Sequence, residues 1–212
     1  MPGCSTREIV SIIKEKYHTE SIAHLTCINS TKEDIDRIIG EFEQYGIENV
    51  LALRGDINPN VPPKQDFKHA SDLITYMKAR SDLSFSGACY PEGHLECDSI
   101  DEDIENLKRK VDAGADHLIS QLFFDNGAFY RFLDKARAAG INVPIEAGIM
   151  PCVNAASIKR MVGLCGASLP PKFTKIIARF GDDPNAMRDA GIAYANEQII
   201  ELVSSGVDGI HL

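Results

Sequence analysis

The chain has 212 residues, of which 44% are apolar and 25% are charged, and its formal net charge is -9. A chain of this size and composition can bury a substantial core, and we expect a single domain over residues 1–212. The acidic balance argues against a nucleic-acid surface, which needs clustered Lys and Arg. No apolar run approaches the ~20 residues of a membrane-spanning helix.

Apolar segments of strand length alternate with helical patterns along the chain. The first helix is expected at Ser5–Tyr17, with no strand before it. Strands rich in branched residues are expected at Ser21–Cys27, Ile47–Leu53, Leu83–Tyr90, His117–Phe123 and Val143–Ile149, with a short sixth at Val207–Leu212. The clearest further helices are Thr31–Tyr45, Ile100–Ala113, Asn126–Ala139 and Asn185–Ser204. Left-handed cap residues are expected after helices at Gly46, Gly114, Gly140 and Gly206.

The alternation predicts a parallel sheet buried on both faces by helices. No GxGxxG motif follows the early strands, and polar residues follow almost every strand. Both features favour an α/β barrel of the (β/α)8 TIM type over a dinucleotide-binding fold. Because a closed barrel has eight strands, the sequence indicates an incomplete one, with about five full strands, part of the last, and the first two missing.

The six cysteines form no CxxC pair, and the first residues do not resemble a secretory signal. Both observations indicate a reducing, cytoplasmic location.

Two strand ends carry candidate site residues in the first half of the chain. Alternation places His24 and Thr26 on one strand face, and from the pattern alone His24 is equally a polar core residue or a ligand contact. The next strand ends in Leu53-Arg54-Gly55-Asp56 and continues into a loop that begins Ile57-Asn58-Pro59-Asn60. The glycine permits close backbone approach, and a carboxylate at this end of a barrel strand is a stronger functional candidate than a surface ion pair.

The third strand leads into Tyr90-Pro91-Glu92-Gly93-His94. The Tyr90 ring can cover a planar ligand, and Glu92 with His94 could form an acid–base or metal pair. Together with Cys97, however, they match no strong zinc spacing.

The following helix carries a polar sector of about 120° that holds Asp103, Asn106, Arg109 and Lys110. A solvated helix face is the simpler interpretation, although this mixture suits ribityl hydroxyls and a pyrophosphate. Gln121 lies late in an apolar strand, where its amide could recognise the donor–acceptor edge of a pterin or similar ring.

Taken together, five motifs resemble the methylenetetrahydrofolate reductase family in order and spacing. They are His24-Leu25-Thr26-Cys27, Leu53-Arg54-Gly55-Asp56, Tyr90-Pro91-Glu92-Gly93-His94, the segment from Asn106 to Ala115, and Gln121-Leu122-Phe123-Phe124-Asp125. The resemblance implies the catalytic barrel of a bacterial-type enzyme of one-carbon and methionine metabolism. Such an enzyme uses FAD to reduce 5,10-methylenetetrahydrofolate to 5-methyltetrahydrofolate with electrons from NADH or NADPH.

Carried over by motif, the resemblance implies a set of FAD-binding residues: His24, Leu53, Arg54, Gly55, Asp56, Tyr90, His94, Asp103, Asn106, Arg109 and Lys110. Asp56 and Gln121 are the implied catalytic and folate-binding residues, with Asp56 near the flavin ring and Gln121 on the pterin. No metal is implied. The family's general-acid glutamate, on its first strand, has no counterpart here, and Ser157 and Met161 stand where the family often has glutamine and an aromatic residue.

Three hypotheses follow. The first is a working reductase of which this sequence is a fragment. The second is a non-catalytic or partner-dependent flavin-binding barrel, completed as a homo-oligomer or by another chain. The third is a metal-dependent barrel hydrolase that uses Glu92, His94 and Cys97.

Overall fold

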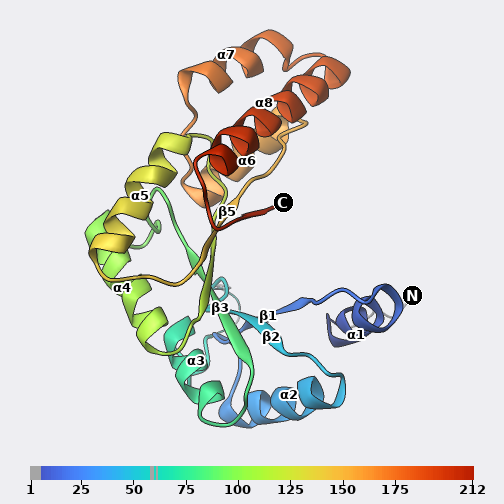
Figure 1. Ribbon diagram of the computed structural model, residues 1–212, viewed down its shortest axis with the longest axis vertical. Coiled ribbons are helices and arrows are strands. Elements are labelled where there is room, and N and C mark those ends of the chain that lie inside the picture. The colour runs from blue at the N-terminus through green and yellow to red at the C-terminus, as the bar shows by residue number, and fades with distance from the viewer. Residues whose placement is uncertain (1–5, 58–59, 61) are drawn as a thin grey trace. The chain divides into compact units, whose positions relative to one another are not determined.

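The computed structural model of the chain describes residues 6–57, 60 and 62–212 (Figure 1). Ser5, where the first helix was expected to begin, lies outside the described residues, as do Asn58 and Pro59 of the loop after the second strand. Helices and strands alternate through most of the described chain, as the sequence predicts. None of the described helices is both long and apolar enough to cross a membrane.

The strands are parallel and follow the chain order β1-β2-β3-β4-β5-β6. Their bounds are β1 (Ile22–Thr26), β2 (Asn49–Leu53), β3 (Ser84–Cys89), β4 (His117–Ser120), β5 (Ile145–Gly148) and β6 (Gly209–His211). The helices that flank them are α1 (Thr6–Tyr17), α2 (Lys32–Gln44), α3 (Ala70–Lys78), α4 (Ile100–Asp112), α5 (Asn126–Ala138), α6 (Ala155–Cys165), α7 (Pro171–Phe180) and α8 (Pro184–Ser204). The predicted α/β class is confirmed.

One detail of the prediction was wrong. The fourth strand was expected to reach Phe123, but β4 ends at Ser120, and Leu122 and Phe124 join a hydrophobic core formed with helices instead. Helices α3 and α7 were also not predicted, because α3 is short and α7 begins in a Pro-Pro pair that is typical of a loop. The four glycines expected to be left-handed all have positive φ.

The chain divides into two compact units, Met1–Ala88 with Arg109–His117 and Cys89–Lys108 with Leu118–Leu212. In the first unit, β1 pairs with β2 from Ile22↔Asn49 to Thr26↔Leu53. Alternate residues of β1 are buried, so Leu25 packs into the core formed with α2 and α3, whereas His24 and Thr26 are exposed on the opposite face. The strand period therefore decides which side chains a ligand can reach.

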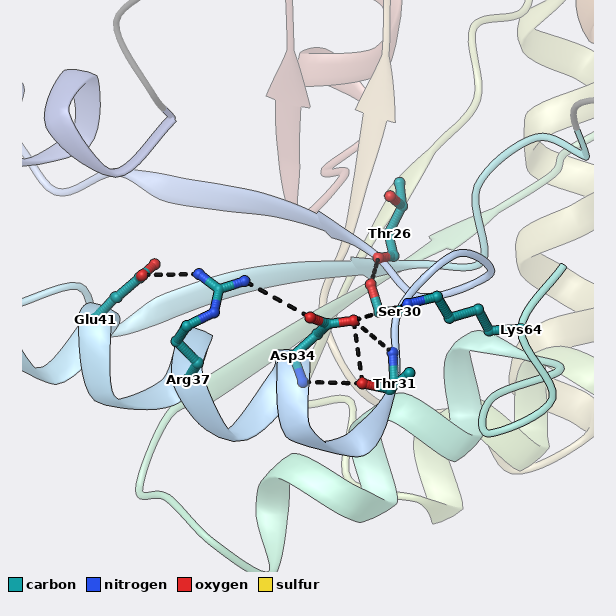
Figure 2. Close-up of polar contacts among 7 residues, drawn as sticks. All are labelled: Thr26, Ser30, Thr31, Asp34, Arg37, Glu41 and Lys64. Atoms are coloured by element: carbon teal, nitrogen blue, oxygen red, sulfur yellow. Dashed lines mark hydrogen bonds and ion pairs between the residues drawn. The ribbon is translucent and has the colours of Figure 1, made fainter. Parts of the chain in front are cut away.

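Helix α2 begins with a capping box. The Thr31 hydroxyl accepts from the Asp34 N–H at 3.2 Å, and the Asp34 carboxylate accepts from the Thr31 N–H at 3.0 Å (Figure 2). These bonds satisfy backbone donors that the first turn of a helix leaves without partners. The pKa of Asp34 is lowered to about 2. The largest cause is the hydrogen bond from the Thr31 backbone, and the second is the hydrogen bond from the Lys64 ammonium.

The second unit has a core in which an aromatic stack joins the end of β4 to two helices. The Phe173 ring of α7 lies 5.0 Å from Phe124 and 4.4 Å from Tyr194 of α8. The Tyr194 hydroxyl donates to the Phe124 carbonyl at 2.6 Å, and burial is the main cause that raises the pKa of Tyr194 to about 12. The buried Gln198 donates to the Asn126 side chain at 3.2 Å, which ties α8 to α5.

Helix α8 also approaches the loop after β5 at a glycine. A Cβ atom added at Gly191 would lie 2.0 Å from the Cys152 carbonyl oxygen, closer than any real contact. The close approach of these two segments therefore requires glycine at this position.

We predict that Gly191→Ala lowers the free energy of unfolding by about 3 kcal/mol, because backbone atoms must separate to admit the methyl group. The matched control is Gly163→Ala on α6, where an added Cβ meets nothing within 4 Å. That variant should be neutral or stabilising by up to about 1 kcal/mol, because alanine favours the helix. Urea unfolding of both variants checks this, and equal effects would contradict it.

The Asp34 cap predicts a pH dependence with a defined sign. Since folding lowers this pKa from its ordinary value of about 3.9, the carboxylate stabilises the folded chain above about pH 4, and this contribution is lost as the pH falls toward 2. The stability difference between wild type and Asp34→Asn should therefore be constant at neutral pH and shrink below pH 4. Denaturant unfolding across this range measures it, and a difference that grows on acidification would disprove the assignment.

Candidate functional site

The ends of β1 and β2 are joined by backbone hydrogen bonds that continue beyond the strands. The Cys27 N–H donates to the Leu53 and Arg54 carbonyls at 3.1 and 3.2 Å, and the Ile28 N–H donates to the Arg54 carbonyl at 2.9 Å. The half-buried Arg54 side chain turns back, with Nε donating to the Gly55 carbonyl at 3.3 Å. This edge of the first unit is therefore held in register up to the residues that were predicted to bind a ligand.

Gly55 has a φ of +88°, and a Cβ there would lie 2.9 Å from Thr26 Cβ. The close backbone approach that the glycine was expected to permit is thus an approach to the end of β1. Asp56 follows directly and is exposed, as is His24. His24 thus stands on the face of β1 opposite the hydrophobic core of the first unit.

The two basic residues of α4 that belong to the first unit differ in their surroundings. Arg109 is exposed, whereas Lys110 is half-buried and its ammonium donates to the Ala88 carbonyl at 2.7 Å. This bond orients the Lys110 ammonium toward the end of β3. On β3, buried Ser86 shares a hydrogen bond of 3.1 Å with His117 Nδ1, a contact that the sequence did not indicate.

In the second unit the loop after β3 folds around His94. The Tyr90 and His94 rings meet edge to face, with centroids 4.6 Å apart. The Glu96 N–H donates to His94 Nδ1 at 3.1 Å, so Nδ1 is an acceptor and a neutral ring carries its proton on Nε2. The loop therefore presents one edge of the imidazole in a fixed orientation.

Asp103 closes this loop from α4 and is only 5% exposed. Its carboxylate accepts from the His94 N–H at 3.2 Å and from the Cys97 thiol at 3.8 Å, and the Asn106 amide donates to the same sulfur at 3.6 Å. Burial raises the pKa of Cys97, which keeps it a thiol, although the Asn106 hydrogen bond partly opposes this. The polar sector of α4 is thus not a uniformly solvated face, because Asp103 organises the loop.

Gln121 stands at the end of β4, half-buried. Its N–H donates to the Cys89 carbonyl at 2.8 Å and its side-chain oxygen accepts from the Leu122 N–H at 3.1 Å. The side-chain NH₂ donates no hydrogen bond within the described part of the chain. The backbone and one half of the amide are thus fixed, while the other half can recognise a ligand.

The remaining candidates lie elsewhere in the second unit. The Glu92 carboxylate accepts from the Ser168 N–H at 3.0 Å with each oxygen, which ties the loop after β3 to the segment between α6 and α7. Among the residues that the structure describes, no three His, Cys, Asp or Glu side chains are grouped as metal ligands would be. On α6, Ser157 is exposed and Met161 packs against the core.

Comparison with known proteins identifies the group to which this arrangement belongs. The family model described as methylenetetrahydrofolate reductase matches residues 3–212. The chain belongs to the methylenetetrahydrofolate reductase family. Methylenetetrahydrofolate reductase 1 of Schizosaccharomyces pombe is 36% identical over 97% of this chain and 35% of its own length. The 5,10-methylenetetrahydrofolate reductase of Escherichia coli is 35% identical over 97% of this chain and 69% of its own. The chain thus spans about a third of the yeast relative and just over two thirds of the bacterial one.

Solved structures share the fold of this family member. A protein from Clostridium thermocellum described as binding two copies of 5-methyl-5,6,7,8-tetrahydrofolic acid is 18% identical, with a TM-score of 0.57 over 94% of this chain and 69% of that one. A 2,3-dimethylmalate lyase is 14% identical, with a TM-score of 0.51 over 96% of this chain and 78% of that one. At these identities the likeness shows the fold alone.

The position of Asp103 generates a prediction that separates a structural role from ligand binding. Asp103→Ala leaves the partly buried His94 N–H without its acceptor, which should cost about 1 kcal/mol of unfolding free energy. The matched control is Asp101→Ala on the same helix, where an exposed ion pair with Lys135 is lost and the cost should stay below about 0.5 kcal/mol. Both are measured by urea unfolding without any ligand, and equal costs would show that Asp103 is not needed for the loop.

Proposed function

We propose that the chain forms the FAD-binding barrel of a methylenetetrahydrofolate reductase that converts 5,10-methylenetetrahydrofolate to 5-methyltetrahydrofolate with electrons from NADH or NADPH. The family match over residues 3–212 carries this proposal. It is supported by the site residues, since Asp56 and Gln121 keep accessible polar groups at the ends of β2 and β4. The reaction belongs to one-carbon and methionine metabolism.

The donor set fits the chemistry of FAD. When bound, FAD would supply a carrier that accepts and releases hydride. Arg54, Arg109 and Lys110 provide cations suited to a pyrophosphate and donors for ribityl hydroxyls. Tyr90 and His94 add an aromatic surface, and His24, Leu53, Gly55, Asp103 and Asn106 complete the proposed contacts.

Two residues would act on the folate. The Asp56 carboxylate would stabilise positive charge on the substrate after its five-membered ring opens, and the same charge would oppose the addition of electrons to a nearby flavin. The Gln121 amide, with its oxygen already oriented by the Leu122 N–H, would hold the pterin. The proton that opens the ring is assigned to no residue here, because the family's first-strand glutamate has no counterpart in this sequence.

The setting of the reaction is part of the same proposal. The described cysteines are free, and burial raises the pKa of Cys27 and Cys152 to about 11, so these thiols stay protonated and unreactive. We place the enzyme in the cytoplasm.

We also propose a homo-oligomer, or a complex with another chain that completes the barrel, since β1 and β6 end the strand order and can accept a further strand.

The absorbance spectrum of the purified chain is the first test. Flavin bands that NADH or NADPH bleaches, and that methylenetetrahydrofolate restores, would support the reductase. Flavin that bleaches but is not restored by folate would favour a flavin-binding barrel without the folate half-reaction. A colourless chain that FAD does not reconstitute would contradict cofactor binding by these residues.

Gln121→Leu should separate the two halves of the reaction. Loss of the amide should raise the KM for the folate about tenfold or more, because an amide hydrogen bond to the pterin is lost. Reduction of the flavin by the nicotinamide should be unchanged. Steady-state kinetics and anaerobic flavin reduction measure the two effects, with Gln44→Leu on the exposed face of α2 as control. Slower flavin reduction with an unchanged KM would contradict the assignment.

A further inference from the structure

The loop between β2 and α3 is fastened at both ends to a single residue. The Ile28 N–H donates to the Arg54 carbonyl at 2.9 Å, and the Ile28 carbonyl accepts from the Lys64 N–H at 3.0 Å. The loop thus leaves the end of β2 at Arg54 and returns at Lys64 to the same residue, Ile28. Closing a loop at one point restricts the positions that the residues within it can occupy.

Side chains reinforce the returning end of the loop. The Lys64 ammonium donates to Asp34 Oδ2 at 3.3 Å, and the Asp66 carboxylate accepts from the Lys32 N–H at 2.9 Å. Both contacts join the loop to the first turn of α2. Figure 2 shows Lys64 reaching Asp34 from one side, next to the capping threonine Thr31.

Asp34 is a rigid partner for this contact. Its Oδ2 atom also accepts from the Thr31 N–H at 3.0 Å and the Thr31 hydroxyl at 3.1 Å, so the capping box fixes the carboxylate that Lys64 meets. On the other side, Arg37 lies 3.8 Å from Asp34 Oδ1 and donates to Glu41 at 2.9 Å (Figure 2). Arg37 is therefore a second cation on the same carboxylate that does not belong to the loop.

Asp56 lies within this loop, two residues after Arg54. Its carboxylate makes no hydrogen bond or ion pair to any residue that the structure describes, so its place is set by the backbone on either side. On one side is Gly55, which has a positive φ. Because glycine has no Cβ, its side chain does not restrict the backbone dihedral angles next to Asp56. The first side-chain contact between the loop and α2 after Asp56, among the described residues, is that of Lys64 with Asp34.

We infer that Lys64 and Asp34 are positioning residues that hold the Asp56 carboxylate in place by fastening the loop to the start of α2. The inference rests on the proposed function, in which Asp56 stands near the flavin and the folate. Neither residue touches substrate or cofactor. Their contribution is to narrow the range of places that an otherwise unattached carboxylate can occupy.

The test uses Lys64→Met, which removes the ammonium but keeps the backbone bond to Ile28, and Lys64→Arg, which keeps a cation. Arg37→Met is the matched control, because it removes a cation from Asp34 outside the loop. In Lys64→Met, the hydrogen of the backbone amide at position 64 should exchange with solvent about two- to fivefold faster, as expected for loss of an exposed ion pair. Lys64→Arg and Arg37→Met should exchange at the wild-type rate.

The second measurement is the midpoint potential of the bound flavin. Lys64→Met should shift it to more positive values, in the same direction as Asp56→Asn but by less, because a displaced carboxylate opposes reduction less. In the Asp56→Asn background, Lys64→Met should have no further effect. A shift that persists there, an equal shift in Arg37→Met, or unchanged exchange and potential would each overturn the inference.

Failure of the proposed function gives a different result. If the wild-type chain binds no flavin, the reductase proposal falls, and the exchange comparison still decides whether Lys64 fastens the loop. Faster exchange confined to Lys64→Met would then support the anchor without its catalytic purpose, whereas equal exchange in all variants would reject the anchor as well.

Discussion

The pairing of β1 with β2 is the constraint on which the first unit depends. Its register buries one face of β1 against α2 and α3 and leaves His24 on the other. The same ladder continues past the strands, where Cys27 and Ile28 bind the Arg54 carbonyl. Because the backbone is fixed up to Arg54, side chains that follow it leave the sheet from a defined point. A slip of one residue would exchange the buried and exposed faces.

In the second unit, the backbone next to the candidate site residues is fixed by side-chain contacts instead of a strand ladder. There the loop after β3 is organised by a buried carboxylate, since Asp103 accepts from a backbone amide and from the Cys97 thiol. The segment after β4 is held by aromatic stacking of Phe124 with Phe173 and by the Tyr194 hydrogen bond. These buried polar groups are thus paired, as a low-dielectric interior requires. Candidate site residues such as Gln121 therefore follow segments that are themselves packed.

The sequence predicted what depends on local periodicity and missed what depends on distant partners. Branched apolar runs located the strands, and glycines such as Gly46 and Gly140 marked helix ends because a left-handed residue there has few alternatives. The end of β4 was misplaced because the apolar run continues into a helix core. The burial of Asp103 could not be predicted, since its partners lie in a loop with no periodic pattern. Nothing near Lys64 indicates Asp34, thirty residues away.

The geometry at Gly55 bears on how the Arg54-Gly55-Asp56 tripeptide can be used to recognise related proteins. An added Cβ would strike Thr26, so the glycine records how two neighbouring strands meet rather than what the loop binds. We expect Arg54 and Asp56 to carry the chemical information, because the proposed function assigns a ligand contact to each of their charges. A distant relative that keeps the glycine but has lost both charged neighbours would share this strand geometry while having no reason to share the chemistry, and homology searches should weight the three positions accordingly.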